Sequence, residues 1–524
     1  MNLTQRRAGV LLHITSLPGP HGIGDFGPEA RHFVDWLVAA GQRLWQLLPT
    51  TPIGPGDSPY QSVSAFAGSP LMVALEPLVA QGWLDASALS GARFDAQQVD
   101  YARVEPWRLA RLREAASGFH ANARAEDHDA LTAWCAAHAH WLADYTLFMA
   151  LEVAHGGRPW WEWPQPMRER RPEALTAARR EHAAEIAFWE FVQWCFDTQF
   201  AALRAYANAR DVALLGDLPI FIAHHSADCW ARPDLFELDA RFQPTVVAGV
   251  PPDAFTAEGQ RWGNPLYRWD RMAVENFVWW AARVRRALAQ TDGFRIDHFR
   301  GFAAYWEVPA DCPTAMQGRW VPGPGAALFE ALADALAGAP ANALANALAN
   351  PLGALPIVAE DLGIITPDVT ALREACGFPG MRVMQFAFGS DAGHAYLPHQ
   401  FEPATVAYTG THDNDTVQGW WHTAPPRERA FVGSYLGAGG DDIHWAMIRA
   451  VCNSVANTVV VPLQDVLGLD GSHRMNRPGS PTGNWAWRFD WAMVGAEPAR
   501  VLGVISAASG RGRFALLDLP GALG

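Results

Sequence analysis

Three short apolar segments of the sequence each end on a carboxylate. The segments are Gly293–His298, Leu355–Gly363 and Val406–Asp415, and their acids are Asp297, Glu360 and Asp413. Cleavage of a glycosidic bond with retention needs one carboxylate as nucleophile and a second as general acid. If the segments are strands of one sheet, their acids meet at its carboxyl edge, so the spacing predicts nucleophilic and acid–base chemistry there.

Arg295 stands two residues before Asp297. Residues two apart on a strand point to the same side, so the guanidinium would lie beside the carboxylate and keep it ionised. An ionised, oriented Asp suits a nucleophile that forms a glycosyl ester. A buried ion pair that merely stabilises the mouth of a barrel fits the same spacing equally well.

Glu360 ends the second segment and is followed at once by Asp361. Asp361 points to the opposite side of a strand, so Glu360 is the better inward candidate. A general acid needs a raised pKa, which burial or a nearby negative charge provides. The alternative is a helix-capping acid, a role for which Thr366 and Asp368 are better placed.

The third acid lies in the polar stretch Thr411–Asp415. This stretch fits a site for sugar hydroxyls, with Asp413 and His412 as binding groups, or an Asx-rich turn before a helix. Neither residue has further ligands at metal-binding spacing, so we expect no zinc. Two weaker signals are Asp217 at the end of another apolar run and a turn with Tyr60 at its tip.

Eight apolar runs separated by helical stretches predict the elements that position these acids. The runs are Gly9–His13, Arg43–Leu48, Val212–Leu218, Gly293–Asp297, Pro356–Glu360, Arg382–Phe388, Thr405–Thr409 and Thr458–Leu463. Most are continuous rather than alternating, as buried parallel strands are. The helices expected between them include Glu29–Ala40, Phe188–Arg210, Val278–Ala289 and Pro367–Ala375. The alternation predicts an α/β fold, a (β/α)8 TIM barrel with its active site at the carboxyl ends of the strands.

Some gaps between strands are much longer than a βα repeat of roughly 30 residues allows. We therefore expect a single catalytic domain over residues 1–524 that carries inserted, mainly helical subdomains on its catalytic face. The insertions are a helical one at about 68–210 between strands two and three, a loop-rich one at 219–290, and one at 298–355. The last includes an Ala/Asn-rich near-repeat at residues 341–350, to which we assign no function.

Composition narrows the class of partner and the compartment. The formal net charge of −14 is spread along the chain, which argues against nucleic acid or an anionic membrane as partner. The six cysteines lack CxxC spacing, as in a reduced cytoplasmic protein, and no signal peptide or membrane-spanning run is apparent. Motifs for dinucleotides, for phosphate loops and for a serine nucleophile are missing. Most of the 24 tryptophans fit a large core, and some would suit stacking on sugars.

Longer blocks of sequence point to a known family. They are Gly9–His13 with Ser16–Gly19, Gly56–Gln61, Gly216–Phe221, Ala248–Asp253, Gln260–Tyr267, Arg295–Gly301, Ala359–Gly363, Thr411–Asp415 and Arg474–Gly479. In these blocks the chain resembles the amylomaltases, the 4-α-glucanotransferases (disproportionating enzymes) of glycoside hydrolase family 77. The resemblance runs from Gly9 to about Asp490. Two positions depart from the family's usual pattern, His225 in place of Asp and Pro55 in place of an aromatic residue.

The resemblance implies a retaining transglycosylase without cofactor or catalytic metal and without a C-terminal β-sandwich. Asp297 would be the nucleophile, Glu360 the general acid/base, and Asp413 the residue that stabilises the distorted sugar. The implied substrate-binding residues are Tyr60, Ser58, Asp217, Arg295, His412, Trp262, Asn264 and Asn476. A loop over residues 248–264, with Trp262 and Phe255, would cover the groove and exclude water.

The implied activity moves an α-1,4-glucan segment from a donor maltodextrin to the 4-hydroxyl of an acceptor glucan or glucose. The partners would be maltooligosaccharides and glucans derived from starch or glycogen, in the carbohydrate metabolism of the cytoplasm. We expect the two catalytic carboxyl groups to lie roughly 5–5.5 Å apart. An α-glucan hydrolase with water as acceptor has the same acids and stays an alternative, whereas a non-catalytic glucan-binding barrel would be expected to lack at least one of them.

Overall fold

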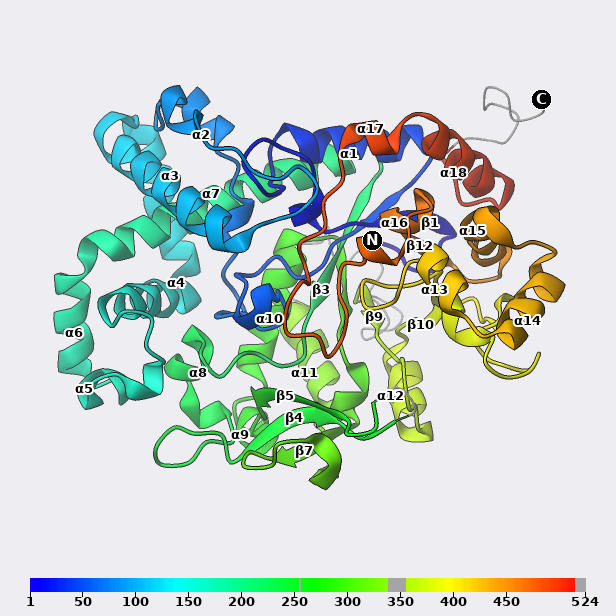
Figure 1. The fold of residues 1–524 in the computed structure, drawn as a ribbon. Helices are drawn as coiled ribbons and strands as arrows, with labels where there is room; N and C mark the ends of the chain where they lie inside the picture. The colour runs from blue at the N-terminus through cyan, green and yellow to red at the C-terminus, as the bar shows by residue number, and fades with distance from the viewer. Residues whose placement is uncertain (254–255, 338–354, 514–524) are drawn as a thin grey trace.

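The computed structural model describes residues 1–253, 256–337 and 355–513 (Figure 1). Its central feature is a sheet of eight parallel strands that curves into a nearly closed barrel, in the order β10-β11-β12-β1-β2-β3-β6-β9. The strands are β1 (Arg7–Leu11), β2 (Leu44–Gln46), β3 (Ala213–Leu218), β6 (Gly293–Ile296), β9 (Ile357–Ala359), β10 (Gly380–Val383), β11 (Thr405–Tyr408) and β12 (Thr458–Pro462). The barrel predicted from the eight apolar runs is confirmed.

The strands at the centre of the sheet are buried along their whole length. In β12 the run Thr-Val-Val-Val-Pro is buried at each position, as is β1, which pairs with it from Arg7 opposite Thr458 to Leu11 opposite Pro462. Helices pack outside the barrel and side chains fill its interior, so a barrel strand has no solvent face and its sequence does not alternate.

The predicted strand Arg382–Phe388 is wrong in its bounds. β10 occupies Gly380–Val383, and a 3-10 turn, η9 (Met384–Ala387), follows it directly. Met384, Gln385 and Ala387 are buried in this turn, so the apolar run continues although the strand has ended. Burial at the mouth of the barrel therefore extends the pattern beyond the element.

Four helices that cover the barrel lie close to where they were expected: α1 (Pro28–Ala39), α7 (Ala183–Asn208), α10 (Val278–Gln290) and α12 (Pro367–Cys376). Two further helices near the C-terminus, α15 (Ile443–Asn453) and α18 (Glu497–Ala508), were not predicted. In α1, proline occupies the first turn, and Phe33 and Trp36 lie on the buried face. Gly41, with φ 69°, follows the helix and lets the chain turn back toward β2.

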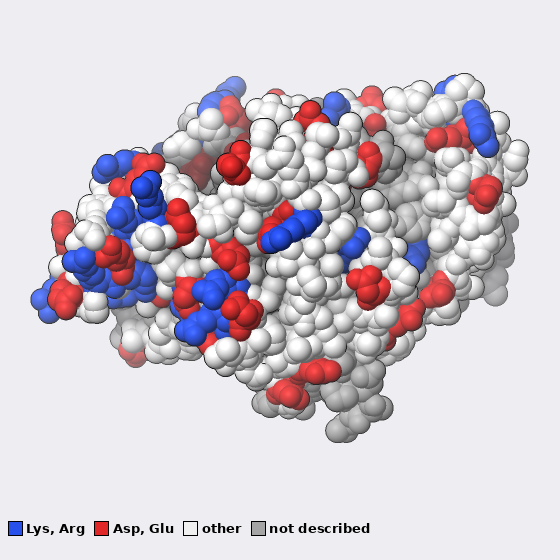
Figure 2. Space-filling view, turned by 90° about the horizontal axis from the view of Figure 1, so that it is seen from below, with Lys and Arg blue, Asp and Glu red and all other residues white. Residues whose placement is uncertain are grey.

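Between β2 and β3 the chain forms a group of helices that projects from the barrel at the left of Figure 1. They are α2 (Glu76–Ala80), α3 (Tyr101–Asn122), α4 (Ala125–Ala154), α5 (Gln165–Arg168) and α6 (Pro172–Glu181), and α7 leads back to β3. Figure 2 shows that acidic and basic side chains intermingle at the left of the face seen from below, while much of the remaining face is uncharged.

A second sheet was missed by the sequence analysis. It is antiparallel, in the order β5-β4-β7-β8, and consists of β4 (Val246–Val250), β5 (Gln260–Pro265), β7 (Ala304–Pro309) and β8 (Arg319–Pro322). Val247 lies opposite Val308, so the segments that follow β3 and β6 are joined into one structure. Phe255 and the near-repeat at residues 341–350 lie outside the described residues.

The two end strands of the barrel sheet, β9 and β10, meet next to Glu360. Ala359 N–H donates to Pro379 O across this seam at 3.0 Å. The buried Asp361 accepts a 2.6 Å hydrogen bond from Met381 N–H and contacts the guanidinium of Arg382 at 3.3 Å. A side chain thus supplies the cohesion that a ladder of main-chain bonds supplies elsewhere in the barrel.

After β12 the described chain, up to residue 513, forms α16 (Leu463–Val466), α17 (Trp491–Val494), α18 and irregular segments, and no further strand. A C-terminal β-sandwich is therefore not found within the described residues, as expected. Among the same residues, no helix combines the length and the apolarity that crossing a bilayer requires.

Candidate active site

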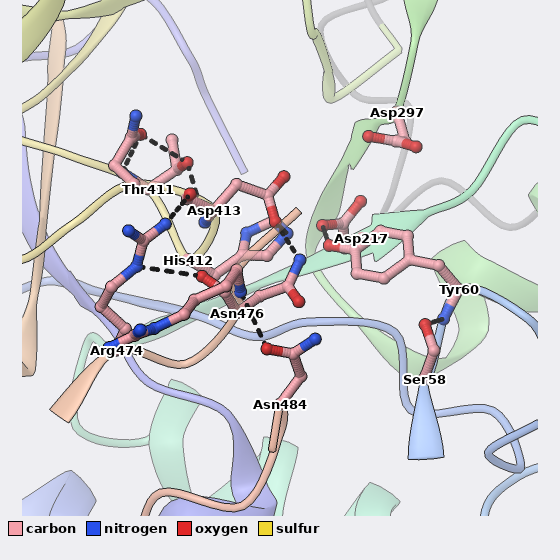
Figure 3. A network of polar contacts seen from close by, with 12 residues as sticks. Ser58, Tyr60, Asp217, Asp297, Thr411, His412, Asp413, Arg474, Asn476 and Asn484 are labelled. Carbon is pink, nitrogen blue, oxygen red and sulfur yellow. Dashed lines mark hydrogen bonds and ion pairs between the residues drawn. The ribbon is translucent and has the colours of Figure 1, made fainter. Parts of the chain in front are cut away.

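The carboxyl ends of four barrel strands bring the predicted acids to one face, partly seen in Figure 3. Asp217 lies within β3, Asp297 follows β6, and Glu360 follows β9 directly. Asp413 lies in the turn after β11. This is the face on which barrel enzymes build their active sites.

Arg295 bridges two of these acids. One guanidinium nitrogen lies 2.6 Å from Asp217 Oδ2 and another lies 2.5 Å from Asp297 Oδ1. The side chain of Asp217 is completely buried, whereas that of Asp297 is 25% exposed. The bridge therefore stabilises a buried charge and also leaves one of the two carboxylates accessible to a substrate.

Asp217 has a second partner in Tyr60, whose hydroxyl donates a 2.7 Å hydrogen bond to Oδ2. Burial raises the pKa of Asp217 to about 7, against the lowering effect of Arg295 and with a further contribution from Asp297. Its Oδ1 has no hydrogen-bond partner within the described part of the chain. A buried acceptor of this kind is costly unless a ligand satisfies it.

Main-chain N–H groups fix both oxygens of Glu360. His298 N–H donates to Oε2 at 2.8 Å and Leu362 N–H donates to Oε1 at 2.9 Å. Burial raises the pKa of Glu360 to about 7, Arg295 lowers it, and Asp297 raises it further. A carboxyl group that is protonated near neutral pH and held in one orientation is suited to general acid catalysis.

Asp413 is more exposed than the other acids, with 43% of its side chain accessible. Asn476 Nδ2 donates a 2.6 Å hydrogen bond to Oδ1, and His412 Nε2 lies 3.2 Å from the same oxygen (Figure 3). Arg474 donates to the main-chain oxygen of Asp413 at 2.8 Å. The turn is thus held from the Arg474–Gly479 segment, far along the chain.

Aromatic rings pack around His412, the histidine that contacts Asp413. The Tyr60 ring stacks on His412 with centroids 5.3 Å apart, and the Trp485 ring is tilted against both. Burial lowers the pKa of His412, so its ring is neutral at neutral pH. Trp485 was missed by the sequence analysis, although it stands nine residues after Asn476 in a run with alternating tryptophans.

His13 is a second residue that the sequence analysis did not single out. It is buried and lines one cavity together with His412, and burial, reinforced by His412, lowers its pKa to about 3. It belongs to the Gly9–His13 block, and a histidine at the carboxyl end of a barrel strand was a usable signal.

Three predicted binding residues use their polar groups within the protein. Ser58 Oγ accepts from Tyr60 N–H at 3.2 Å and so shapes the turn that carries the tyrosine. Asn264 is buried, donates to Ile222 O at 2.8 Å and forms a paired amide contact with Gln61 at 3.1 and 3.2 Å. Trp262 Nε1 donates to the side chain of Gln260, and the indole ring stays half-buried.

The same surroundings decide what the acids can bind. The carboxylate oxygens of the acids accept hydrogen bonds from arginine and amide N–H groups. Such donors suit carboxylates that react with a substrate, whereas a cation would need those oxygens as ligands. Among the described residues, no group of three or more His, Cys, Asp or Glu side chains is arranged to hold a metal ion.

Known proteins that are similar to this chain over most of its length are 4-alpha-glucanotransferases. The family model described as 4-alpha-glucanotransferase matches residues 12–493. A 4-alpha-glucanotransferase of Thermus thermophilus is 49% identical over 493 residues, which cover 92% of this chain and 95% of the relative. The chloroplastic/amyloplastic 4-alpha-glucanotransferase DPE1 of Arabidopsis thaliana is 42% identical, over 93% of this chain and 82% of the relative.

Solved structures agree with the fold. Amylomaltase from Streptococcus agalactiae, in complex with acarbose, superposes with a TM-score of 0.91 at 36% identity, covering 97% of this chain and 100% of that one. Amylomaltase from Corynebacterium glutamicum has a TM-score of 0.77 at 18% identity, over 97% and 75% of the two chains, and supports the fold alone.

Proposed function

This chain belongs to the 4-alpha-glucanotransferase family, glycoside hydrolase family 77, and on that premise we propose how its site acts. The enzyme transfers an α-1,4-glucan segment from a donor maltodextrin to the 4-hydroxyl of an acceptor glucan or glucose. It does so with retention, through a covalent glycosyl ester on Asp297. The observation that carries the proposal is the pairing of a Glu360 fixed by two N–H groups with an Asp297 held by Arg295.

In the first half-reaction Glu360 delivers its proton to the glycosidic oxygen as the bond to the anomeric carbon breaks. Asp297 attacks that carbon, and the leaving glucan departs with the proton from Glu360. The raised pKa of Glu360, caused mainly by burial, keeps the proton available near neutral pH. The Arg295 guanidinium, 2.5 Å from Asp297, favours the ionised nucleophile.

In the second half-reaction the ionised Glu360 accepts the proton of an incoming 4-hydroxyl. The hydroxyl oxygen attacks the anomeric carbon and releases the Asp297 carboxylate, so the new bond has the configuration of the old one. Two inversions give net retention, and no electrons are gained or lost. Water in place of the sugar hydroxyl would give hydrolysis.

We assign the sugar at the point of cleavage to the groups around Asp217 and Asp413. The unpartnered Oδ1 of the buried Asp217 is an acceptor for a sugar hydroxyl, and the stacked rings of Tyr60 and His412 form a wall of this pocket. Asp413, oriented by Asn476, stabilises positive charge that develops on the sugar ring. Trp262 packs against the ring of His298, whose main-chain N–H donates to Glu360, and in this position it shields the ester from water.

The ligand in the Streptococcus agalactiae structure, acarbose, supports glucans and maltooligosaccharides as the substrates proposed here. We propose a cytoplasmic role in maltodextrin and glycogen metabolism, which the six free cysteines favour. We also propose that the helices between β2 and β3, with the segments at 219–290 and 298–355, are insertions in a single catalytic domain and frame the glucan groove.

The test is an incubation of the purified protein with maltotriose alone, with glucose, chain lengths and total reducing ends followed together. Transfer gives glucose and a ladder of longer maltodextrins while the number of reducing ends stays constant. Reducing ends that rise in step with glucose, without a ladder, would establish the hydrolase instead. The Asp297→Asn variant should produce neither, because it lacks the nucleophile.

A further inference from the structure

His298, the residue directly after Asp297, has a left-handed backbone with φ 48° and ψ 49°. Residues other than glycine adopt this conformation uncommonly, because the Cβ crowds the following carbonyl, although asparagine, aspartate and histidine are found in it more often than the rest. Strain of this kind persists where the surrounding structure uses it. The use here lies in the direction of two consecutive main-chain N–H groups.

Both N–H groups reach Glu360. His298 N–H donates to Glu360 Oε2 at 2.8 Å, and Phe299 N–H donates to Glu360 O at 3.1 Å. The left-handed residue turns the chain so that successive amides converge, an arrangement that suits anionic oxygens. The segment that carries Asp297 is thereby attached to both the main chain and the side chain of Glu360.

The imidazole of His298 has a different neighbour. It packs edge to face against Trp262 of β5, with ring centroids 4.8 Å apart at 83°. Burial lowers its pKa to about 4, so the ring is neutral at neutral pH. Gly301 leaves room for it, since a Cβ there would come within 3.1 Å of the ring. Glycine would hold the backbone of residue 298 with less strain, so the backbone conformation does not by itself account for the ring, which contacts Trp262.

We propose that His298 is a positioning residue. Its left-handed main chain orients Glu360, and its ring fixes the position of Trp262 relative to Glu360. This inference rests on the proposed role of Glu360 as general acid/base. One residue, which need not touch the reacting atoms itself, would thus fix the positions of both the proton donor and the shielding indole.

The groups around Glu360 determine in which direction its pKa would shift if the bond from His298 N–H were lost. Arg295 lowers its pKa, whereas Asp297 and the neighbouring Asp361 raise it. Tyr396 is also close enough to Glu360 for the two groups to interact electrostatically. Donation by His298 N–H favours the ionised form, so losing this bond must raise the pKa of Glu360. Simple misfolding would lower the rate without moving the pH profile.

The experiment compares His298→Gly and His298→Asn, which accept a left-handed backbone, with His298→Ala and His298→Val, which resist it. The measurement is the pH dependence of kcat/KM for maltotriose disproportionation. We expect the Gly and Asn variants to keep the basic limb of the native enzyme. In the Val variant kcat should fall at least about 10-fold and the basic limb should move to higher pH, with Ala between.

A matched control for backbone strain is Asn276→Val. Asn276 is exposed, has φ 50°, and lies between α9 (Trp269–Val274) and α10. This variant should lower the melting temperature without moving the pH profile. A folded His298→Val enzyme with an unmoved basic limb would overturn the main-chain part of the proposal, and so would a Gly variant that shifts as far as Val. If the Val variant does not fold, the Ala and Gly pair decides by the same criterion.

The role of the His298 ring is tested by a separate measurement, the ratio of hydrolysis to transfer. His298→Gly and His298→Asn should raise the ratio of hydrolysis to transfer, as Trp262→Ala does, and adding Trp262→Ala should raise it little further. Additive effects would overturn the coupling through the ring. Glu360→Gln is measured in parallel: if its basic limb persists, the proposed function fails. If that limb is lost but His298→Val leaves it in place, the inference on His298 alone fails.

Discussion

The side-chain amide of Asn476 donates a 2.6 Å hydrogen bond to Asp413 Oδ1, across 63 positions of sequence. Asn476→Ala removes this charge-assisted bond, while the contact of His412 with the same carboxylate oxygen and the bond from Arg474 to the main-chain oxygen of Asp413 stay in place. A hydrogen bond to a charged group contributes about 1.5–3 kcal/mol, so we expect kcat to fall by about 10- to 150-fold. Initial rates of maltotriose disproportionation at saturating substrate measure it.

A matched control for this substitution exists on the opposite side of the barrel. Asn208 Nδ2 also donates to a carboxylate, Asp292 Oδ1, at 3.1 Å, next to the amino end of β6. Asn208→Ala should leave kcat within about twofold, because an exposed bond of this kind contributes little. Equal losses in both variants would contradict the role given to Asn476.

Arg295 offers a test of geometry rather than charge. Its two nitrogens contact Asp217 and Asp297 at 2.6 and 2.5 Å, and a single ammonium group has no such fixed fork. Arg295→Lys should therefore lower kcat at least about 100-fold, or about 2.7 kcal/mol, although the charge is kept. Single-turnover formation of the glycosyl ester measures the effect on the first step. A lysine variant with near-native kcat would refute the bridging role.

Glu360 predicts the pH dependence of the first half-reaction. Its pKa is raised to about 7, mainly by burial, and the proton is needed for departure of the leaving group. We expect kcat/KM to decline as pH rises through about 7, and a limb that persists unchanged in Glu360→Gln would belong to another group.

The same shift has a consequence for stability. A pKa raised above the usual 4.5 means that the folded protein binds this proton more tightly than the unfolded chain. The contribution is complete below about 4.5 and is lost as pH rises through about 7. Glu360→Gln stays neutral at both pH values. The melting temperature of this variant minus that of the native enzyme should therefore be higher at pH 8.5 than at pH 5, by about 1 °C or more. Calorimetry at the two pH values checks the sign.

Trp262 predicts how the intermediate is partitioned between sugar and water. Its half-buried ring beside His298 shields the site, so Trp262→Ala should raise the ratio of hydrolysis to transfer several-fold. Trp320→Ala is the control, since this tryptophan is 39% exposed on β8, at the other end of the same sheet. Product analysis with maltotriose gives the ratio, and an unchanged value for Trp262→Ala would count against shielding.

Much of the barrel was predictable because its strands are buried on both faces and its acids stand at strand ends. Continuous apolar runs located the eight strands, and acids at the ends of such runs predicted Asp297 and Glu360. The sixth strand was displaced because Gln385 and its neighbours are buried in a turn and extend the apolar run. A run of buried residues records burial and not the element that causes it.

The second sheet was not predictable in the same way. β4 and β7 pair across more than fifty residues of sequence, and their short strands carry glycine and proline, which weaken the strand pattern. The use of Asn264 within the protein, by Gln61 and Ile222, was hidden for the same reason, because both partners lie in loops distant in sequence. The left-handed His298 leaves no mark on composition at all.

The seam between β9 and β10 gives the barrel a preferred place to open. Within the part of the chain that the structure describes, the side chain of Asp361 and one main-chain hydrogen bond join the two strands, and Glu360 is the residue before Asp361. Protection from hydrogen exchange should therefore fail first in β9, well before β1 and β12 at the centre of the sheet. On heating, the proposed proton donor, Glu360, would be displaced while most of the fold persists. Thermal inactivation would then precede unfolding, and its onset would depend on Asp361.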